Sequence, residues 1–204
     1  MILETILVGP MQVNCYVLAC AKNREAIIID PGDQTDKINA VLNKYLLKPA
    51  LVINTHGHYD HIGSDDDFNT AVYIHKLDLP MLQRADKNLS SFFSNPYKVK
   101  SEIKTLEDGQ IIKLDCLELE VIHLPGHTPG GIGLLLKKPQ DNIIFTGDTL
   151  FCQGIGRYDL EGSSQADLEK AIRERLFVLP AQTKVYPGHG RSTTIKDEQQ
   201  NNLF

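Results

Sequence analysis

Four short segments rich in histidine and aspartate constrain this chain more than any other feature. The first is Thr55–His61, T-H-G-H-Y-D-H, which offers four candidate metal ligands; the others centre on His127, Asp148 and His189. Gly or Pro stands close to the donor in each segment, a composition typical of a tight turn. Imidazole nitrogens and carboxylate oxygens suit Zn²⁺, Fe and Mn. Five of the seven histidines lie in these segments, so the fold has to bring distant loops to one metal site.

The composition excludes several classes of protein. The 204 residues are 42% hydrophobic and 23% charged, as expected for a globular protein with a substantial core. A net charge of −5 without a basic stripe gives no reason to expect a nucleic-acid partner. No apolar run approaches the length that crosses a bilayer, and Met1–Glu4 does not resemble the start of a secretory signal. We therefore expect a cytoplasmic protein without a membrane partner, whose oligomeric state stays open.

The four cysteines show no ligand spacing. Cys15, Cys20, Cys116 and Cys152 form no C-x-x-C pair and lie far from the histidine segments in the sequence. In apolar strand-like stretches a free cysteine behaves as a small hydrophobic residue. Because the cytosol keeps thiols reduced, we expect free thiols that bind no metal.

The first half of the chain alternates between strand-like and helix-like patterns. Met1–Val8, Val13–Ala19 and Ala26–Asp30 are typical of consecutive strands. Apolar residues spaced by three and four predict a helix over Thr35–Leu47. Leu51–Ile53 is a short buried strand, and the first histidine segment begins where it ends.

The second half repeats this alternation. A helix is predicted over Ser164–Phe177, a short strand at Val185-Tyr186 and a polar helix over Thr194–Asn202. Four strands are predicted before them, at Ile111–Leu114, Leu117–His123, Gly131–Leu136 and Asn142–Phe145. All ligand segments follow strands, which gathers them at one rim of a sheet structure. Without a visible linker, residues 1–204 are interpreted as one domain.

Three features leave alternatives open. Asn88–Ser101 has the weakest pattern and is either a flap over the site or an irregular connection. Asp65–Asp67 fits a cation site or, more readily, a solvated helix start. His75 and His123 are interpreted as structural, although a supporting role is conceivable for His123, four residues before His127.

Spacing inside the first segment indicates an extended loop. His56 and His58 project to the same side of extended backbone, whereas on a helix they would diverge. Asp60 continues this alternation and His61 turns the other way, so one loop can present donors to two neighbouring ions.

The segments T-H-G-H-Y-D-H, P-G-H-T-P-G, T-G-D-T-L-F and Y-P-G-H-G resemble the metal-binding motifs of the metallo-β-lactamase superfamily. Together with N-C-Y and I-D-P-G near the start, their order most resembles its glyoxalase II-like enzymes, short hydroxyacylglutathione hydrolase-like proteins. The resemblance covers nearly the whole chain. It implies an α/β (α+β) fold, the metallo-β-lactamase αβ/βα sandwich of two packed mixed β-sheets flanked by helices, with the site at one edge.

The resemblance also implies a site for two divalent metal ions, zinc first, with Fe or Mn possible. Carried over by position, one ion is held by His56, His58 and His127, the other by Asp60, His61 and His189, and Asp148 bridges them. The implied reaction is attack of a metal-bridging hydroxide on a thioester such as S-lactoylglutathione, a 2-hydroxyacyl thioester. Asp60 and Asp148 are therefore candidate catalytic residues, and whether Asp60 acts as a base is left open.

The chain departs from the better-known members in its substrate-binding part. It stops fifteen residues after His189, so we expect no C-terminal helical glutathione-binding domain. Arg157 and Tyr158 resemble the family's basic and aromatic substrate contacts, offset by one residue; a structural ion pair is the alternative for Arg157. Where the family often has an aromatic residue this chain has Gly190-Arg191, which makes Arg191 a candidate contact for another anionic thiol carrier.

Two alternative functions remain besides the small-molecule thioester hydrolase. A mononuclear iron persulfide dioxygenase resembles the chain around Gly-Arg-x-Asp, but it usually has cysteine in place of Ile155 and alanine in place of Gly188. A non-catalytic metal-binding module of the same fold would commonly lose ligands, and none is missing here. The sequence therefore favours the hydrolase.

Overall fold

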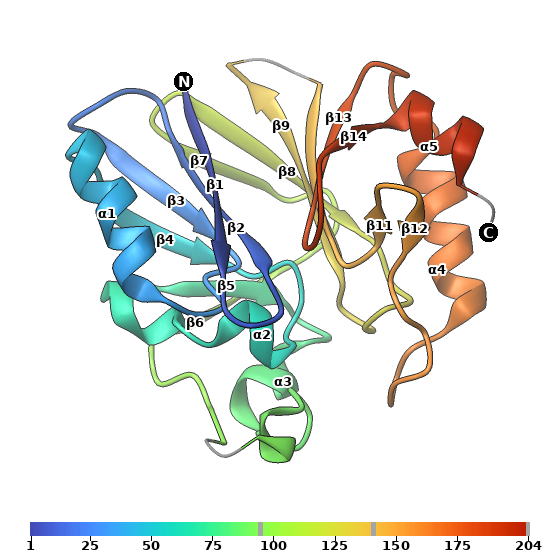
Figure 1. Ribbon diagram of the computed structural model, residues 1–204, viewed down its shortest axis with the longest axis horizontal. Coiled ribbons are helices and arrows are strands. Elements are labelled where there is room, and N and C mark those ends of the chain that lie inside the picture. Colours follow the sequence, from blue (N-terminus) through green and yellow to red (C-terminus); the bar gives the residue numbers. More distant parts are fainter. Residues whose placement is uncertain (94–95, 140–141, 203–204) are drawn as a thin grey trace.

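Two six-stranded mixed β-sheets pack face to face in the computed structural model, which describes residues 1–93, 96–139 and 142–202 (Figure 1). Sheet A has the order β1 (Ile2–Val8), β2 (Val13–Ala19), β3 (Glu25–Ile29), β4 (Lys48–Ile53), β5 (Val72–His75) and β6 (Ile103–Leu106). Sheet B has the order β14 (Thr193–Thr194), β13 (Lys184–Pro187), β10 (Ile143–Gly147), β9 (Ile132–Lys138), β8 (Leu117–His123) and β7 (Ile111–Leu114). A small ribbon consists of β11 (Leu150–Phe151) and β12 (Gly154–Ile155). This is the predicted fold class.

Helices flank the sandwich on both sides (Figure 1). On the side of sheet A are α1 (Thr35–Tyr45), α2 (Tyr59–Ile62), α3 (Leu79–Gln83) and the 3₁₀ turns η1 (Asp65–Phe68) and η2 (Ser90–Phe92). On the side of sheet B are α4 (Gln165–Ala171), its π-helical continuation η3 (Ile172–Leu176) and α5 (Ile195–Asn201). Among the described residues, none of these helices has the length and apolar character that crossing a membrane requires.

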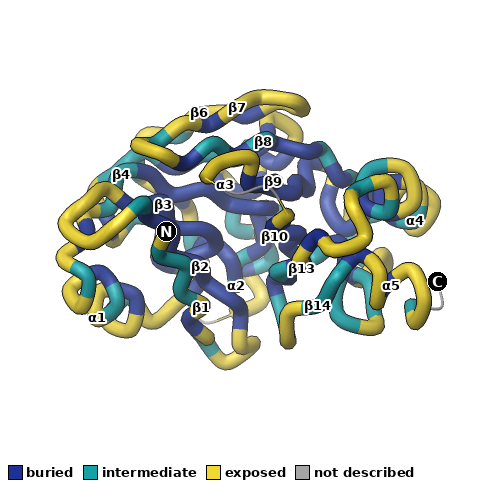
Figure 2. The backbone as a smooth tube through the Cα atoms, turned by 90° about the horizontal axis from the view of Figure 1, so that it is seen from above, coloured by how far each residue is buried: buried dark blue, intermediate teal, exposed yellow. Residues whose placement is uncertain are grey.

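Strands at the centre of the sandwich are buried on both faces. All residues of β2 are buried, and Figure 2 shows the centre of the molecule in the dark blue of buried residues. Along β2 successive side chains point to opposite faces. Tyr16 therefore packs with Phe145 of sheet B, at 4.9 Å between ring centroids, while Val17 belongs to the core beneath α1. A third core fills the space between sheet B and α4, around Leu168. The α/β layers thus follow from strands that are apolar on both faces.

Contacts between the sheets hold the rim on which the predicted ligands lie. The side chain of Asn14, on β2, donates to the carbonyl oxygens of Pro187 at 2.9 Å and Gly190 at 2.8 Å. The hydroxyl of Tyr16 donates to the Pro187 carbonyl at 2.6 Å. The loop that follows β13 and carries His189 is therefore fastened to sheet A.

The expectation of free thiols is wrong for two cysteines. Cys20 and Cys116 form a disulfide across a sequence separation of 96 residues, whereas Cys15 and Cys152 are free. The pairing joins the end of β2 to the β7–β8 turn, so it arises from the packing of the two sheets. No local spacing could have indicated it.

Two local expectations in the first ligand region are also wrong. Asp60 and His61 do not continue an extended segment, because α2 begins at Tyr59 and the His61 N–H bonds the His58 carbonyl at 3.0 Å. Asp65 does begin the helical turn η1, but it is fully buried and accepts a bond from Asn54 at 2.6 Å rather than facing solvent.

The weakly patterned segment 88–101 is an irregular connection with the short turn η2; residues 94–95 within it lie outside the described residues. Asp66 holds its far end, accepting bonds from the backbone N–H groups of Lys100 and Ser101 at 2.9 and 2.8 Å. Its near end carries Phe92 and Phe93, which line the cavity described below.

Candidate metal centre

The structure brings the seven predicted ligand side chains to one rim of the sandwich. His56 and His58 follow β4, and α2 then supplies the next two ligands. His127, Asp148 and His189 come from the loops after β8, β10 and β13. Three sets of donor atoms lie within 4.8 Å of one another: His56, His58 and His127; His56, His61 and Asp148; and Asp60, His61 and His189.

The first set consists of three buried histidines. The Nδ1 atom of His58 lies 2.9 Å from Nε2 of His127, and the His56 ring packs at 4.8 Å between ring centroids from each of them. Burial lowers the pKa of His58 to about 3, and burial with neighbouring histidines also lowers the pKa of His56. Both rings are therefore neutral, the form that binds metal.

The set of Asp60, His61 and His189 contains a carboxylate and is more open. Oδ2 of Asp60 lies 3.4 Å from Nε2 of His189 and 3.7 Å from Nε2 of His61. Burial tends to lower the pKa of His61, but the carboxylates of Asp148, Asp60 and Asp30 outweigh burial and raise it. This set therefore places a carboxylate beside its histidines, whereas the first set consists of histidines alone.

Asp148 lies between these two halves. One carboxylate oxygen is 3.4 Å from Nε2 of His61, and the other is 3.7 Å from His127 and 3.5 Å from His189. Burial would raise the pKa of Asp148, but the charge of His61 outweighs it and lowers this pKa below the ordinary value. The two oxygens of this carboxylate therefore face histidines of both sets.

Three fully buried atoms in this cluster have no hydrogen-bond partner: Nε2 of His56, Nε2 of His61 and Oδ1 of Asp148. Buried polar atoms are normally paired, and leaving one unpaired costs about 1–3 kcal/mol. All three are donor atoms of the sets above, so cations bound there would satisfy them. The residues present therefore fit a centre of divalent metal ions.

Hydrogen bonds to the Nδ1 atoms orient three of the ligand rings. Nδ1 of His61 lies 3.0 Å from Asp30, whose carboxylate also accepts the backbone N–H and hydroxyl of Thr55, both at 2.7 Å. Nδ1 of His127 donates to the Arg157 carbonyl at 2.8 Å, and Nδ1 of His189 to the Met11 carbonyl at 3.0 Å. Each bond turns Nε2 toward the site, as outer contacts do in metal centres.

Asp78 ties two ligand loops together. Its carboxylate accepts the Gly57 N–H at 3.2 Å from the first loop, and the Thr128 hydroxyl at 2.7 Å and Gly130 N–H at 2.6 Å from the second. Sequence reasoning missed both Asp30 and Asp78 as supporting residues. Asp30 had a signal in the I-D-P-G segment, whereas nothing around Asp78 distinguished it.

Gly188 allows Asp148 to reach the site. A Cβ at this position would come 2.1 Å from Oδ1 of Asp148 and 2.8 Å from Cε1 of His61. Any larger residue would displace the carboxylate from its place between the two ligand sets.

The candidate substrate contacts are less closely associated with the cluster. Arg157 lines the metal cavity, but its guanidinium forms two bonds to Asp159, at 2.8 and 2.9 Å. Tyr158 is 43% exposed and is not part of that lining. Arg191 lies outside the lining as well and donates to Sγ of Cys152 at 3.1 Å.

His75 and His123 lie apart from the ligand sets. Their rings stack at 4.2 Å between centroids, which joins the end of β5 to the end of β8. Burial, together with His123, lowers the pKa of His75 to about 4. His123 donates through Nε2 to the Pro129 carbonyl at 2.9 Å, close to the His127 loop. These contacts agree with a structural pair.

A cavity of about 310 Å³ opens onto the cluster. Beside the ligands, its lining is mostly apolar and includes Met11, Phe92, Phe93 and Leu160. A small molecule can therefore reach the donor atoms, a requirement for a catalytic rather than a purely structural metal site.

A family model described as the metallo-beta-lactamase superfamily matches residues 8–189, across all four ligand segments. The chain belongs to the metallo-β-lactamase superfamily. Within this superfamily it is 31% identical to a protein of Haemophilus influenzae named hydroxyacylglutathione hydrolase GloC, covering 99% of this chain and 97% of the relative. The glyoxalase II-like resemblance is thereby confirmed.

Solved structures of the superfamily show the same fold. The BLEG-1 B3 metallo-beta-lactamase is 33% identical, with a TM-score of 0.91 over 100% of this chain and 99% of the other. TTHA1623, solved in a di-iron-bound form, is 33% identical, with a TM-score of 0.82 over 98% of this chain and 99% of the other.

Proposed function

We propose that this superfamily member is a hydrolase that uses two divalent metal ions to cleave a thioester. The observation that carries the proposal is the cluster of seven side chains with three buried, unpartnered donor atoms. The name of the Haemophilus influenzae relative supports the thioester as the substrate class.

In this proposal His56, His58 and His127 hold one ion, Asp60, His61 and His189 hold the other, and Asp148 contacts both. The distances around Asp148, 3.4 Å to His61 and 3.7 Å to His127, support its bridging position. Zinc is our first candidate; the di-iron-bound form of TTHA1623 supports iron, and Mn accepts the same donors.

Two ions bound there would lower the pKa of a bound water molecule to roughly 7 and stabilise negative charge on the acyl oxygen. Burial tends to raise the pKa of Asp60, but His61 and His189 lower it overall, so its carboxylate is ionised. Asp60 can therefore accept a hydrogen bond from an attacking water and orient it. A thiolate leaving group, with a pKa of about 8.5, needs no acid from the protein.

The thiol carrier is the second part of the proposal. Glutathione carries two carboxylates. Among the described residues that line the metal cavity, Arg157 is the one with a permanently cationic side chain. Its two bonds to Asp159 lie at an exposed position, where exchange for a substrate carboxylate costs little. Tyr158 and Arg191 remain proposed contacts for a carrier that extends beyond the cavity.

Gly188 bears on the persulfide dioxygenase alternative. That family usually has alanine here, and a Cβ would come 2.1 Å from Oδ1 of Asp148. The glycine keeps the bridging carboxylate in place and so supports a two-ion hydrolase over a one-iron oxygenase. The BLEG-1 structure supports β-lactam hydrolysis as a second candidate activity.

Metal counting combined with three assays tests the proposal. The purified protein is expected to bind two ions per chain and to hydrolyse S-lactoylglutathione. His58→Ala should abolish hydrolysis, while His123→Ala, a histidine outside the ligand sets, should retain it. One iron per chain with oxygen uptake on glutathione persulfide would replace our proposal with the dioxygenase. Cleavage of nitrocefin alone would indicate a β-lactamase, and no turnover would indicate a binding module.

The cytoplasm stays our proposed location, and the disulfide makes it testable. Reducing cytosol seldom retains a disulfide such as Cys20–Cys116. If the cytoplasm is the location, alkylation during cell lysis followed by mass spectrometry should label Cys20 and Cys116 as thiols, although they are bonded in the structure. A pair that is oxidised in cells would argue against the cytoplasm.

A further inference from the structure

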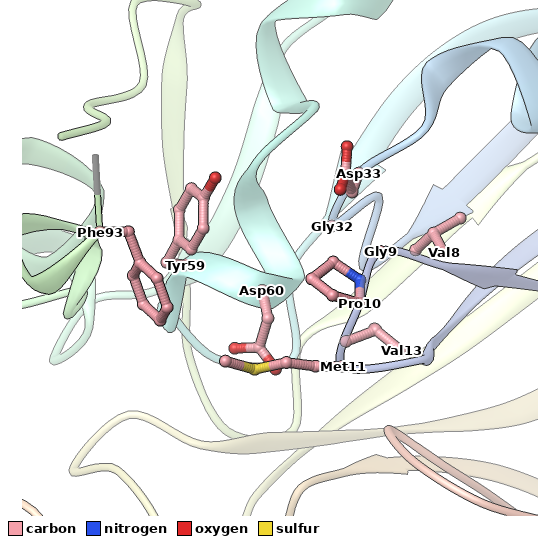
Figure 3. A pocket seen from close by; sticks show the side chains of 10 residues that line it. All are labelled: Val8, Gly9, Pro10, Met11, Val13, Gly32, Asp33, Tyr59, Asp60 and Phe93. Carbon is pink, nitrogen blue, oxygen red and sulfur yellow. The ribbon is translucent and has the colours of Figure 1, made fainter. Parts of the chain in front are cut away.

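A second cavity, of about 180 Å³, adjoins the metal cavity (Figure 3). The two cavities share Met11, Tyr59, Asp60 and Phe93 in their linings. We call the second one the apolar pocket, because its side chains are mainly Val8, Pro10, Met11, Val13, Tyr59 and Phe93. A group bonded to an acyl carbon at the metal cluster can extend into it past Asp60.

Local structure keeps the walls of the apolar pocket in place. The rings of Tyr59 and Phe93 stack at 5.4 Å between centroids with 29° between their planes. Gly32 brings the turn before α1 against α2, since a Cβ there would lie 1.6 Å from the Asp60 carbonyl oxygen. The opposite wall is the β1–β2 turn, closed by the bond from the Gln12 N–H to the Gly9 carbonyl at 3.2 Å.

The charges of the apolar pocket are entirely acidic. Asp33 and Asp60 are its charged lining residues, and among the residues that the structure describes no lysine or arginine belongs to the lining. In Figure 3 the Asp60 carboxylate points toward Met11, away from Asp33 at the other end. No salt bridge within the described part of the chain contains Asp33, an exposed residue whose carboxylate accepts the Gln34 N–H at 2.6 Å. Because Asp60 would be bound to a cation in the metal-loaded protein, Asp33 is the lining charge that would disfavour a carboxylate at the far end of this pocket.

The lining of the metal cavity, in contrast, includes a basic side chain. Arg157 lines the metal cavity but not the apolar pocket. An anionic thiol carrier is therefore better placed toward Arg157. The apolar pocket is then left for the other half of the thioester, the acyl group.

We propose that the apolar pocket binds the acyl group of the substrate and selects an uncharged, apolar one, such as a short alkyl chain or a single aromatic ring. This rests on the proposed thioester hydrolase function. Each methylene transferred from water to an apolar site strengthens binding about fourfold. A lactoyl group is too small and too polar to use this surface.

A series of glutathione thioesters tests the selection on the metal-loaded protein. We expect kcat/KM to rise about tenfold or more from acetyl to hexanoyl and phenylacetyl, and to fall below the acetyl value for succinyl. Equal values along the series, or the highest value for succinyl, would overturn the proposal. A gain on changing the thiol from glutathione to 2-phenylethanethiol, with none along the acyl series, would place the thiol there instead and overturn it too.

Matched variants identify the pocket as the cause. Phe93→Ala should reduce the ratio of phenylacetyl to acetyl kcat/KM several-fold, whereas Leu77→Ala, a half-exposed apolar residue outside both linings, should leave it unchanged. Asp33→Asn keeps the acceptor for the Gln34 N–H and should raise the succinyl rate; Asp36→Asn, nearby on α1, should not. Equal effects of variant and control would contradict the assignment.

Methyl NMR gives a readout that needs no turnover. The chain has three methionines, and only Met11 lines the apolar pocket. Adding phenylacetamide should produce a saturable shift of the Met11 methyl signal, with acetamide as the inactive control. Saturation without cleavage of any thioester would keep the pocket and reject the proposed function. Equal rates for all thioesters of the acyl series, without a shift of the Met11 signal, would reject the acyl-binding role of the pocket and keep the proposed hydrolase function.

Discussion

The ligand cluster and the candidate substrate contacts are held in opposite ways. In the ligand cluster, outer hydrogen bonds hold His61, His127 and His189, and the bond of Asp30 to His61 at 3.0 Å is buried. The substrate rim, which we define as Arg157, Tyr158 and Arg191, is exposed and bonds to neighbours outside the cluster. For the proposed hydrolase, the difference implies that the metal ligands are preorganised, whereas the side chains proposed to bind the thiol carrier can adjust. Substitutions in the two regions should therefore differ greatly in effect.

The largest effect is expected for Asp148→Ala. Because both Asp148 oxygens face the two ligand sets, the variant should bind fewer ions and lose about 10²–10³-fold or more in kcat. Asp159→Ala, an acid exposed at the rim, is the matched control. Metal counting and S-lactoylglutathione kinetics measure both; a variant that keeps two ions and full activity would remove the bridging role.

Gly188→Ala should follow, with about a 10- to 100-fold loss in activity. Its Cβ would come 2.1 Å from Oδ1 of Asp148, so the carboxylate has to shift. Gly154→Ala has open space around its Cβ and should be neutral. If both variants retain activity, the ligand cluster is no more strictly held than the substrate rim.

Asp30→Asn should weaken metal binding about 10- to 100-fold, the usual consequence of losing an outer contact to a ligand histidine. The loss should be measured by competition with a chelator, with Asp36→Asn as the exposed control. Unchanged affinity would mean that the bond from Asp30 does not orient His61.

Asp78→Asn should lower the free energy of unfolding by about 1–3 kcal/mol, because a buried acceptor of three hydrogen bonds between two loops is replaced. Urea denaturation of the metal-free protein isolates this effect from metal binding. Asp86→Asn, at an exposed position, serves as the control. If Asp78→Asn lowers the free energy of unfolding no more than Asp86→Asn does, Asp78 does not hold the two loops together.

Arg157→Ala should show the smallest effect. We expect less than about a tenfold rise in KM for a glutathione thioester and an unchanged kcat, since its ion pair with Asp159 is exposed. Arg175→Ala, which removes the exposed ion pair with Asp108, is the control and should leave KM unchanged. A large fall in kcat would mean that the rim is as strictly positioned as the ligand cluster.

Local patterns in the sequence carry much of this protein's structure. The strand Val13–Ala19 has the predicted bounds, because a largely apolar run is typical of a buried strand. The strands β5 and β6 and the helix α3 were not predicted, since Val72–His75 and Ile103–Leu106 are too short to show a period. The two strands are placed by parallel pairing, β5 with β4 and β6 with β5, which joins residues distant in sequence.

The sequence by itself determined the superfamily and the identity of the candidate donors, because each ligand segment pairs its donor with turn residues and needs no distant contact to be recognised. Tertiary structure alone decided what surrounds those donors. The contacts of Asp30 and Asp78, the Cys20–Cys116 disulfide and the apolar pocket beside Asp60 all join residues that only folding brings together. Packing of two sheets creates such contacts, and a pattern read along the chain does not contain them.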